Sequence, residues 1–120
     1  MTPREFRRIA LGLEDVTEGA HHGHADFRVG GRVFASLGYP DKKSGMVALT
    51  PEQQRVFVRD HPRMFVPVAG KWGEQGATTV RLDAADEETL GEALTLSRQN
   101  VLAKQRVRRS AGKRSTRRAR

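Results

Sequence analysis

The fold is decided by residues 26–37, which read DFRVGGRVFASL. Two short apolar runs flank a central Gly-Gly pair, and such a pair supplies the positive φ angles that a two-residue hairpin turn requires. That turn would place Phe27 opposite Phe34 and Arg28 opposite Val33. Each such pair of cross-strand partners shares a face of the sheet. We therefore expect a β-hairpin at this position.

The second strand of this hairpin, residues 32–37, is apolar on both sides. Phe34 would lie on one face, and Val33, Ala35 and Leu37 on the other. A strand that is apolar on both faces is typical of the interior of a sheet. We expect it to be a central strand.

Helices are expected on both sides of the hairpin. Two of them share a start signal, a threonine N-cap followed by proline and, three residues after the cap, by Glu or Gln: this pattern runs from Thr2 to Glu5 and from Thr50 to Gln53. The third helix begins near Asp86, and its apolar period is lost beyond Val107. The side chains predicted to face the core are Phe6, Ile9, Ala10 and Leu13, then Val56 and Phe57, then Leu90, Ala93, Leu94, Ser97 and Val101.

Further strands are expected at residues 46–49, 64–68 and 78–82, with a loop over 69–77 that holds the single tryptophan, Trp72. The predicted order is α-β-β-β-α-β-β-α. This order favours an α+β fold, a two-layer domain with helices on one face of a mainly antiparallel sheet.

Positive charge is concentrated at the C-terminus. The chain has 22 Lys and Arg against 14 Asp and Glu, a net charge of +8. Residues 104–120 hold nine of these cations and no acid, so residues 1–103 retain 13 cations and 14 acids and are nearly neutral. We expect residues 1–103 to form the domain and residues 104–120 to be a basic, disordered tail.

Several protein classes are disfavoured by the composition. The chain has no cysteine, which excludes disulfides and thiolate chemistry. Charged residues precede any apolar run at the N-terminus, and no stretch has the length of a membrane span, so we expect no membrane partner and a cytoplasmic location.

Three motifs, in order, resemble the MmcQ/YjbR family. They are HGHADFRV at 22–29, RVFASLGYP at 32–40 and WGEQGAT at 72–78. The resemblance covers roughly residues 2–103. It implies a compact αβ fold that has been compared with frataxin-like and secretion-chaperone-like folds, and a DNA-binding role through a "double wing" arrangement of β-hairpins. The basic tail lies outside the resemblance.

A histidine cluster precedes the hairpin. His22, His24 and Asp26 would share one side of a strand, at a spacing that suits a shared zinc or iron ion. Structural sites usually need four ligands, and His61 lies beside a helix end, so the sequence favours residues that cap the strand entry over a metal site. No nucleophile elbow or phosphate-binding glycine loop is present, and we predict neither an enzyme nor a bound cofactor.

The leading hypothesis is sequence-nonspecific nucleic-acid binding, with DNA favoured and RNA left open. Trp72 is included as a residue that could stack on a base, although a lone tryptophan more often packs over the core edge. The predicted contact residues are Arg28, Arg32, Lys42, Lys43, Trp72, Lys104, Arg106, Arg108, Arg109, Lys113, Arg114, Arg117, Arg118 and Arg120.

Two alternatives remain open. The first is a protein-interaction or chaperone-like module without enzymatic activity, whose partner would be a peptide taken at a sheet edge or helix groove. The second is a small metal- or ligand-binding protein that uses His22, His24 and Asp26.

Overall fold

The computed structural model describes the backbone of residues 1–118 and the side chains of residues 1–108. Its elements are α1 (Pro3–Leu11), β1 (Val16–His21), β2 (His24–Val29), β3 (Arg32–Leu37), β4 (Ser44–Ala48), α2 (Pro51–Asp60), β5 (Phe65–Pro67), α3 (Lys71–Glu74), β6 (Ala77–Arg81), the 3₁₀ helix η1 (Leu82–Ala84) and α4 (Glu87–Arg118). Among the described residues, no helix has both the length and the apolar character needed to cross a bilayer.

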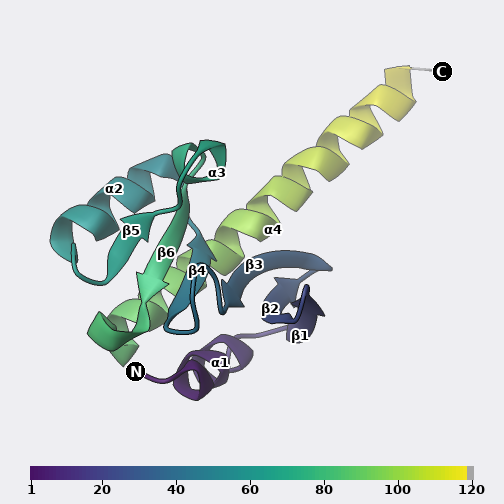
Figure 1. Ribbon diagram of the computed structural model, residues 1–120. Coiled ribbons are helices and arrows are strands. Elements are labelled where there is room, and N and C mark those ends of the chain that lie inside the picture. Colours follow the sequence, from purple (N-terminus) through teal and green to yellow (C-terminus); the bar gives the residue numbers. More distant parts are fainter. Residues whose placement is uncertain (119–120) are drawn as a thin grey trace.

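The strands form one antiparallel sheet in the order β1-β2-β3-β4-β6-β5 (Figure 1). Three helices pack on the same face of it. Phe6 of α1 lies 5.9 Å from Phe27 between ring centroids, Phe57 of α2 lies 5.1 Å from Phe65, and α4 runs along β3 and β4. The predicted α+β fold, with helices on one face, is confirmed, and β3 is an interior strand as expected.

The register of the β2–β3 hairpin differs in part from the prediction. Arg28 pairs with Val33 as expected, but Phe27 pairs with Ala35 because β3 contains one extra residue, Phe34, in a β-bulge. The bulge turns both Phe34 and Ala35 toward the helices, where each is fully buried, and leaves Val33 41% exposed. The predicted pairing of Phe27 with Phe34 is therefore wrong.

Strand β1 was missed. Its sequence, VTEGAH, contains a single large apolar residue and shows no alternation, because β1 is an edge strand that is mostly exposed. Its six residues pair in register with β2, from Val16 opposite Val29 to His21 opposite His24. The predicted order has no strand between α1 and the hairpin, whereas the observed order begins α-β-β-β-β.

The helix starts follow the sequence signals. Thr50 and Gln53 form a complete capping box, whereas at α1 the Thr2 side chain accepts the Glu5 backbone N–H without the reciprocal bond. The inward side of α2 runs through Gln54 and Phe57, which are buried, while Val56 is 45% exposed. The prediction that Val56 faces the core is wrong, because the polar Gln54 occupies the inward position and finds hydrogen-bond partners there.

The predicted loop around Trp72 contains a one-turn helix, α3. Gly73 in this turn lies so close to Val68, just after β5, that a Cβ atom would stand 1.6 Å from the Val68 carbonyl oxygen. The Gln54 amide donates to the Gly73 and Ala77 carbonyls at 2.9 and 3.0 Å, which joins α2 to both ends of this segment. The position of α3 is therefore fixed by close backbone packing and by one buried amide.

Helix α4 supplies the largest part of the helical layer. Leu90, Ala93, Leu94, Ser97 and Val101 are all buried, as predicted. Its backbone continues as a helix to Arg118, whereas the sequence predicted an end near Val107 and disorder from residue 104. Residues 103–118 consist mostly of Ala, Lys, Arg and Gln, which are good helix formers, and they contain no proline. The division of the chain into a domain at residues 1–103 and a basic tail at residues 104–120 stays a prediction.

Candidate nucleic-acid interface

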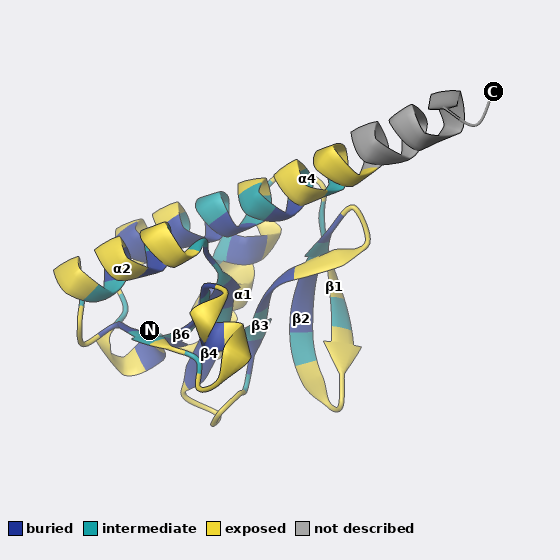
Figure 2. Cartoon of the chain, turned by 90° about the horizontal axis from the view of Figure 1, so that it is seen from above, coloured by how far each residue is buried: buried dark blue, intermediate teal, exposed yellow. Residues whose placement is uncertain are grey.

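The basic half of α4 leaves the domain as a projecting helix. Val101 is its last residue in the core. Four residues later the Gln105 side chain donates to the Gly30 carbonyl at 2.7 Å, which ties the β2–β3 turn to α4. Beyond this contact α4 extends past the rest of the fold, and its described residues there are exposed (Figure 2). The helix thus presents a concentrated positive charge at one end of the molecule.

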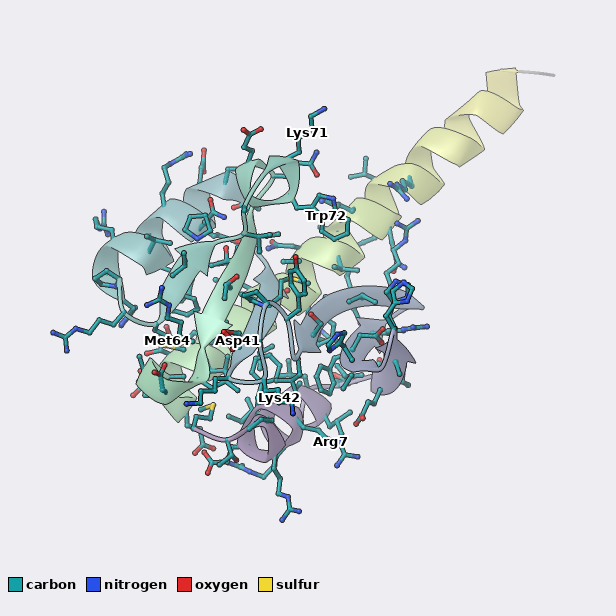
Figure 3. The ribbon with its side chains drawn as sticks, in the orientation of Figure 1. Arg7, Asp41, Lys42, Met64, Lys71 and Trp72 are labelled. Carbon is teal, nitrogen blue, oxygen red and sulfur yellow. The ribbon has the colours of Figure 1, made fainter. Side chains whose placement is uncertain are left out.

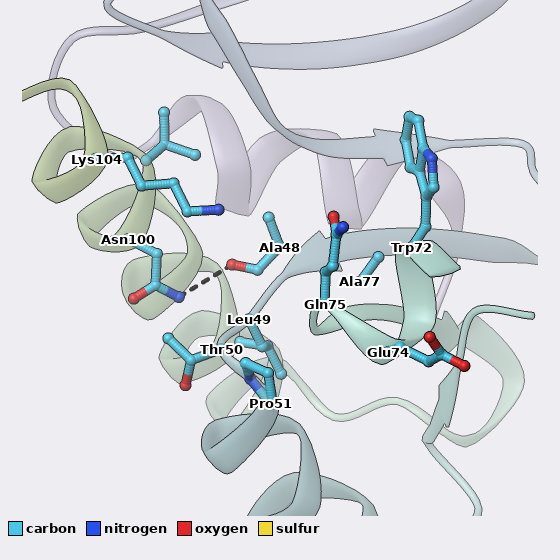
Figure 4. Close-up of a pocket in the computed structure, with 11 residues that line it drawn as sticks. Ala48, Leu49, Thr50, Pro51, Trp72, Glu74, Gln75, Ala77, Asn100 and Lys104 are labelled. Carbon is cyan, nitrogen blue, oxygen red and sulfur yellow. Dashed lines mark hydrogen bonds between the residues drawn. The ribbon is translucent and has the colours of Figure 1, made fainter. Parts of the chain in front are cut away.

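A cleft of about 540 Å³ lies at the base of this projection. Its walls come from the end of β4, the start of α2, helix α3 and α4. Figure 4 shows the Lys104 side chain reaching from α4 toward the cleft, with Trp72 on the opposite wall. The Asn100 amide donates to the Ala48 carbonyl at 3.0 Å and to Gln53 Oε1 at 2.8 Å, and so holds the floor together.

Trp72 is 71% exposed, so the alternative that it packs over the core edge is wrong. An indole ring left exposed to water costs free energy, since the transfer of apolar surface out of water is favourable. The Trp72 backbone is nevertheless held firmly through its neighbour Gly73, which packs against Val68. The structure therefore displays an exposed aromatic residue across the cleft from Lys104.

The two arginines that flank the β2–β3 turn have different surroundings. Arg28 forms a two-pronged ion pair with Asp26, at 2.8 Å from Nε and 3.1 Å from Nη2, and this pair lies over Gly19 of β1. The hydrogen bond that Arg28 donates to Asp26, and then the negative charge of Asp26, raise the pKa of Arg28 above its ordinary value. Arg32 is exposed at the turn that Gln105 ties to α4. Arg32 is thus the hairpin arginine that lies nearer the basic helix.

Lys42 and Lys43 belong to the loop between β3 and β4. The Lys43 carbonyl accepts the backbone N–H of Leu82, so this loop contacts η1. In Figure 3, Lys42 lies beside α1, far from Trp72 and from the projecting part of α4. The structure therefore divides the predicted cations, with Lys42 and Lys43 at one end of the molecule, and Lys104 and the basic helix at the other. The predicted contact residues from Arg109 onward have side chains that lie outside the described residues.

Acidic residues near the hairpin are partly neutralised. Asp26 is paired with Arg28, and Glu18 of β1 is paired with Arg7 of α1. These pairs remove two of the four acids, Glu14, Asp15, Glu18 and Asp26, that could repel a polyanion from this side.

The histidine cluster is not arranged as a metal site. His22 lies in the β1–β2 turn with φ of 51°, and its ring packs against His21 at 4.2 Å between centroids, so it does not share a strand face with His24 and Asp26. Within the part of the chain that the structure describes, no group of three or more His, Asp or Glu side chains could hold a metal ion. The arrangement expected for the metal-binding alternative is therefore wrong.

One exposed aromatic residue was missed by the sequence reasoning. Tyr39, the chain's single tyrosine, is 63% exposed in the loop after β3. The signal was its position in a turn-rich segment, Tyr39-Pro40-Asp41, where an aromatic side chain has no strand or helix face to cover.

The comparisons with known proteins agree with this fold. A family model described as YjbR matches residues 11–100, which excludes the whole basic segment, residues 104–120. The crystal structure of Deinococcus radiodurans protein DR2400, with a DUF419 domain, aligns with a TM-score of 0.67 and 23% identity over 80% of this chain and 75% of that chain. No curated protein matches the chain.

Proposed function

Since the chain belongs to the YjbR family and carries a basic helix beyond the family's matched region, we propose that it binds DNA through phosphate contacts from that helix. The observation that carries the proposal is the uneven charge. Nine Lys and Arg without an acid lie in residues 104–120, and the backbone is helical through residue 118.

The cations up to Arg118 are carried on one continuous helical backbone. Residues 104–118 rise by about 22 Å at 1.5 Å per residue, and an α-helix fits the width of the major groove of B-DNA. Seven of the nine cations are arginines, whose planar guanidinium groups can contact a phosphate through two hydrogen bonds. Contacts of this kind are independent of base sequence.

The test is a salt titration of duplex binding by two proteins, the full chain and a truncation that ends at Arg108. This truncation removes six of the nine cations and keeps Gln105 and every core residue of α4. For each phosphate that is no longer neutralised, the slope of log K against log salt should fall by about 0.9. We expect a slope reduced by up to about 5, with affinity at low salt lower by more than tenfold.

A matched control is the pair Lys42→Gln and Lys43→Gln, which removes two cations at the other end of the molecule. We expect its slope to stay within about one of the full chain's. Equal binding by the full chain and the truncation would exclude residues 109–120 as the contact, and failure of every protein to bind at low salt would exclude binding of duplex DNA.

A further inference from the structure

The face of the sheet opposite the helices carries a row of aligned residues. The register places Asp26 of β2, Ser36 of β3 and Met46 of β4 side by side. Gly19 of β1 and Thr79 of β6 continue the row on either side. The packed helices α1, α2 and α4 cover the other face, so this row belongs to the uncovered side of the sheet.

Above the row is a hollow of about 380 Å³, which we call the open-face groove. Asp26, Ser36 and Met46 lie in its floor, and His24, Tyr39 and Trp72 contribute to its rim. The volume is within the range of small-molecule sites, about 300–1,000 Å³. Both strongly exposed aromatic residues of the domain, Tyr39 and Trp72, thus border one groove.

The charge of the groove is compatible with an anion. Asp26 is its one acidic lining residue, and its carboxylate is 4% exposed and paired with Arg28 at 2.8 Å. The remaining ionisable side chains of the lining are imidazoles and the phenol of Tyr39. A ligand that carries phosphate therefore meets no uncompensated carboxylate in this groove.

Trp72 connects the groove to the basic helix. It lines both the open-face groove and the cleft that contains Lys104. A strand whose phosphates contact Lys104 and the rest of α4 would therefore have its neighbouring bases next to Trp72. Exposed aromatic rings beside a cationic track are the usual arrangement for binding unpaired bases, because every base offers a flat face for stacking.

We propose that the open-face groove binds an unpaired base of a nucleic-acid strand, which stacks on Trp72 and Tyr39 while α4 holds the adjoining phosphates. The proposal rests on the DNA binding proposed above and adds to it a preference for single-stranded segments. The Ser36 hydroxyl in the floor offers a hydrogen-bond partner for a base edge.

The experiment compares binding of the full chain to a fluorescently labelled single strand and to the duplex of the same sequence. The variants are Trp72→Ala, Trp72→Phe and Tyr39→Ala, and the control is Val56→Ala, which shortens an exposed apolar side chain on α2. One stacked base is worth about 1–3 kcal/mol, so Trp72→Ala should weaken single-strand binding by about 5- to 150-fold. Trp72→Phe should recover part of that loss, and duplex affinity should change less than about twofold.

The intrinsic fluorescence of Trp72 gives a second readout, since it is the only tryptophan. Addition of the unlabelled single strand should quench it in the parent protein, and less so in Tyr39→Ala. If duplex binding persists but Trp72→Ala leaves single-strand binding unchanged, this inference fails while the proposed function stands. If free dAMP quenches Trp72 and the single strand does not, the groove takes a small nucleotide and the strand proposal is overturned. If neither strand form binds the parent protein at low salt, both proposals fail together.

Discussion

Ser97→Ala removes one oxygen atom from the middle of the helical layer. Ser97 is fully buried on α4, where its Oγ donates to the Phe34 carbonyl and accepts the Ala48 backbone N–H at 2.7 Å. Phe34 is the extra residue of the β3 bulge, and Ala48 ends β4. A single hydroxyl therefore satisfies one backbone group from each of two neighbouring strands.

The expected cost follows from the two backbone groups that the variant leaves without a partner. A buried backbone group in that state costs about 1–3 kcal/mol, so the two together cost about 2–6 kcal/mol. The higher helix propensity of alanine returns about 0.5 kcal/mol. We expect a net loss of about 1.5–5.5 kcal/mol, which at about 4 °C per kcal/mol for a domain of this size is a fall in Tm of roughly 6–22 °C.

Urea unfolding followed by circular dichroism measures this loss, with Ser36→Ala as the matched control. Ser36 lies half-buried on the uncovered face, and the same change there should stay within about 0.5 kcal/mol. The Ala48 amide should also exchange its hydrogen faster in Ser97→Ala. If Ser97→Ala is no more harmful than Ser36→Ala, the Ser97 hydroxyl does not hold the two strands to α4.

Three further changes test the supports of α3 and α4. Gln54→Leu should lower the free energy of unfolding in urea by about 1–2 kcal/mol, because the Gly73 and Ala77 carbonyls lose this donor but each keeps a backbone partner. The control Gln99→Leu, at an exposed position of α4, should be nearly neutral. Gly73→Ala should displace α3, at a cost of roughly 1–3 kcal/mol or more, and shift the emission of Trp72; an unchanged spectrum and stability would contradict the close approach to Val68. Asp86 accepts the Thr89 backbone N–H at 2.8 Å, and hydrogen bonds from the Thr89 backbone and side chain hold its pKa below the ordinary 3.8. Since the folded state binds a proton at Asp86 less readily than the unfolded state, the ionised cap stabilises the fold above about pH 4, and this contribution falls as the pH drops further. Asp86→Ala should therefore cost about 1 kcal/mol of stability in thermal melts near neutral pH and less at about pH 3. An equal cost at both pH values would refute this linkage.

The elements that could be predicted are those in which local chemistry and burial agree. The capping signals located the starts of α1 and α2, and the apolar period of α4 identified its buried face, including Ser97. Strand β1 could not be predicted, because an edge strand with two mostly exposed faces has no period to detect. The bulge at Phe34 could not be predicted either, since the Phe34 carbonyl accepts a hydrogen bond from the Ser97 hydroxyl on α4, 63 residues away.

The candidate site was predicted in composition but not in arrangement. The sequence identified the basic C-terminus and singled out Trp72, yet it offered no reason to place Trp72 and Lys104 in the walls of one cleft. It also grouped Lys42 and Lys43 with cations from which the structure separates them. Such groupings depend on how the strands order themselves in the sheet, and local sequence carries little information about that order.

Because α4 is continuous, it fixes both the distance and the rotation of its outer part relative to the core. One helix contributes Leu94 and Val101 to the core and then continues outward, so the directions of its outer described side chains, Lys104 to Arg108, are set by their count of residues from the core. With 3.6 residues per turn, a single residue inserted after Ala103 would turn Lys104 and the helical backbone after it by about 100° relative to Trp72 and advance them by about 1.5 Å. Insertion of a near-integral number of turns, such as seven residues, would restore the angle and move the charge outward by about 10 Å. The angular phase of this helix therefore sets the directions in which Lys104, Arg106 and Arg108 point relative to the exposed indole.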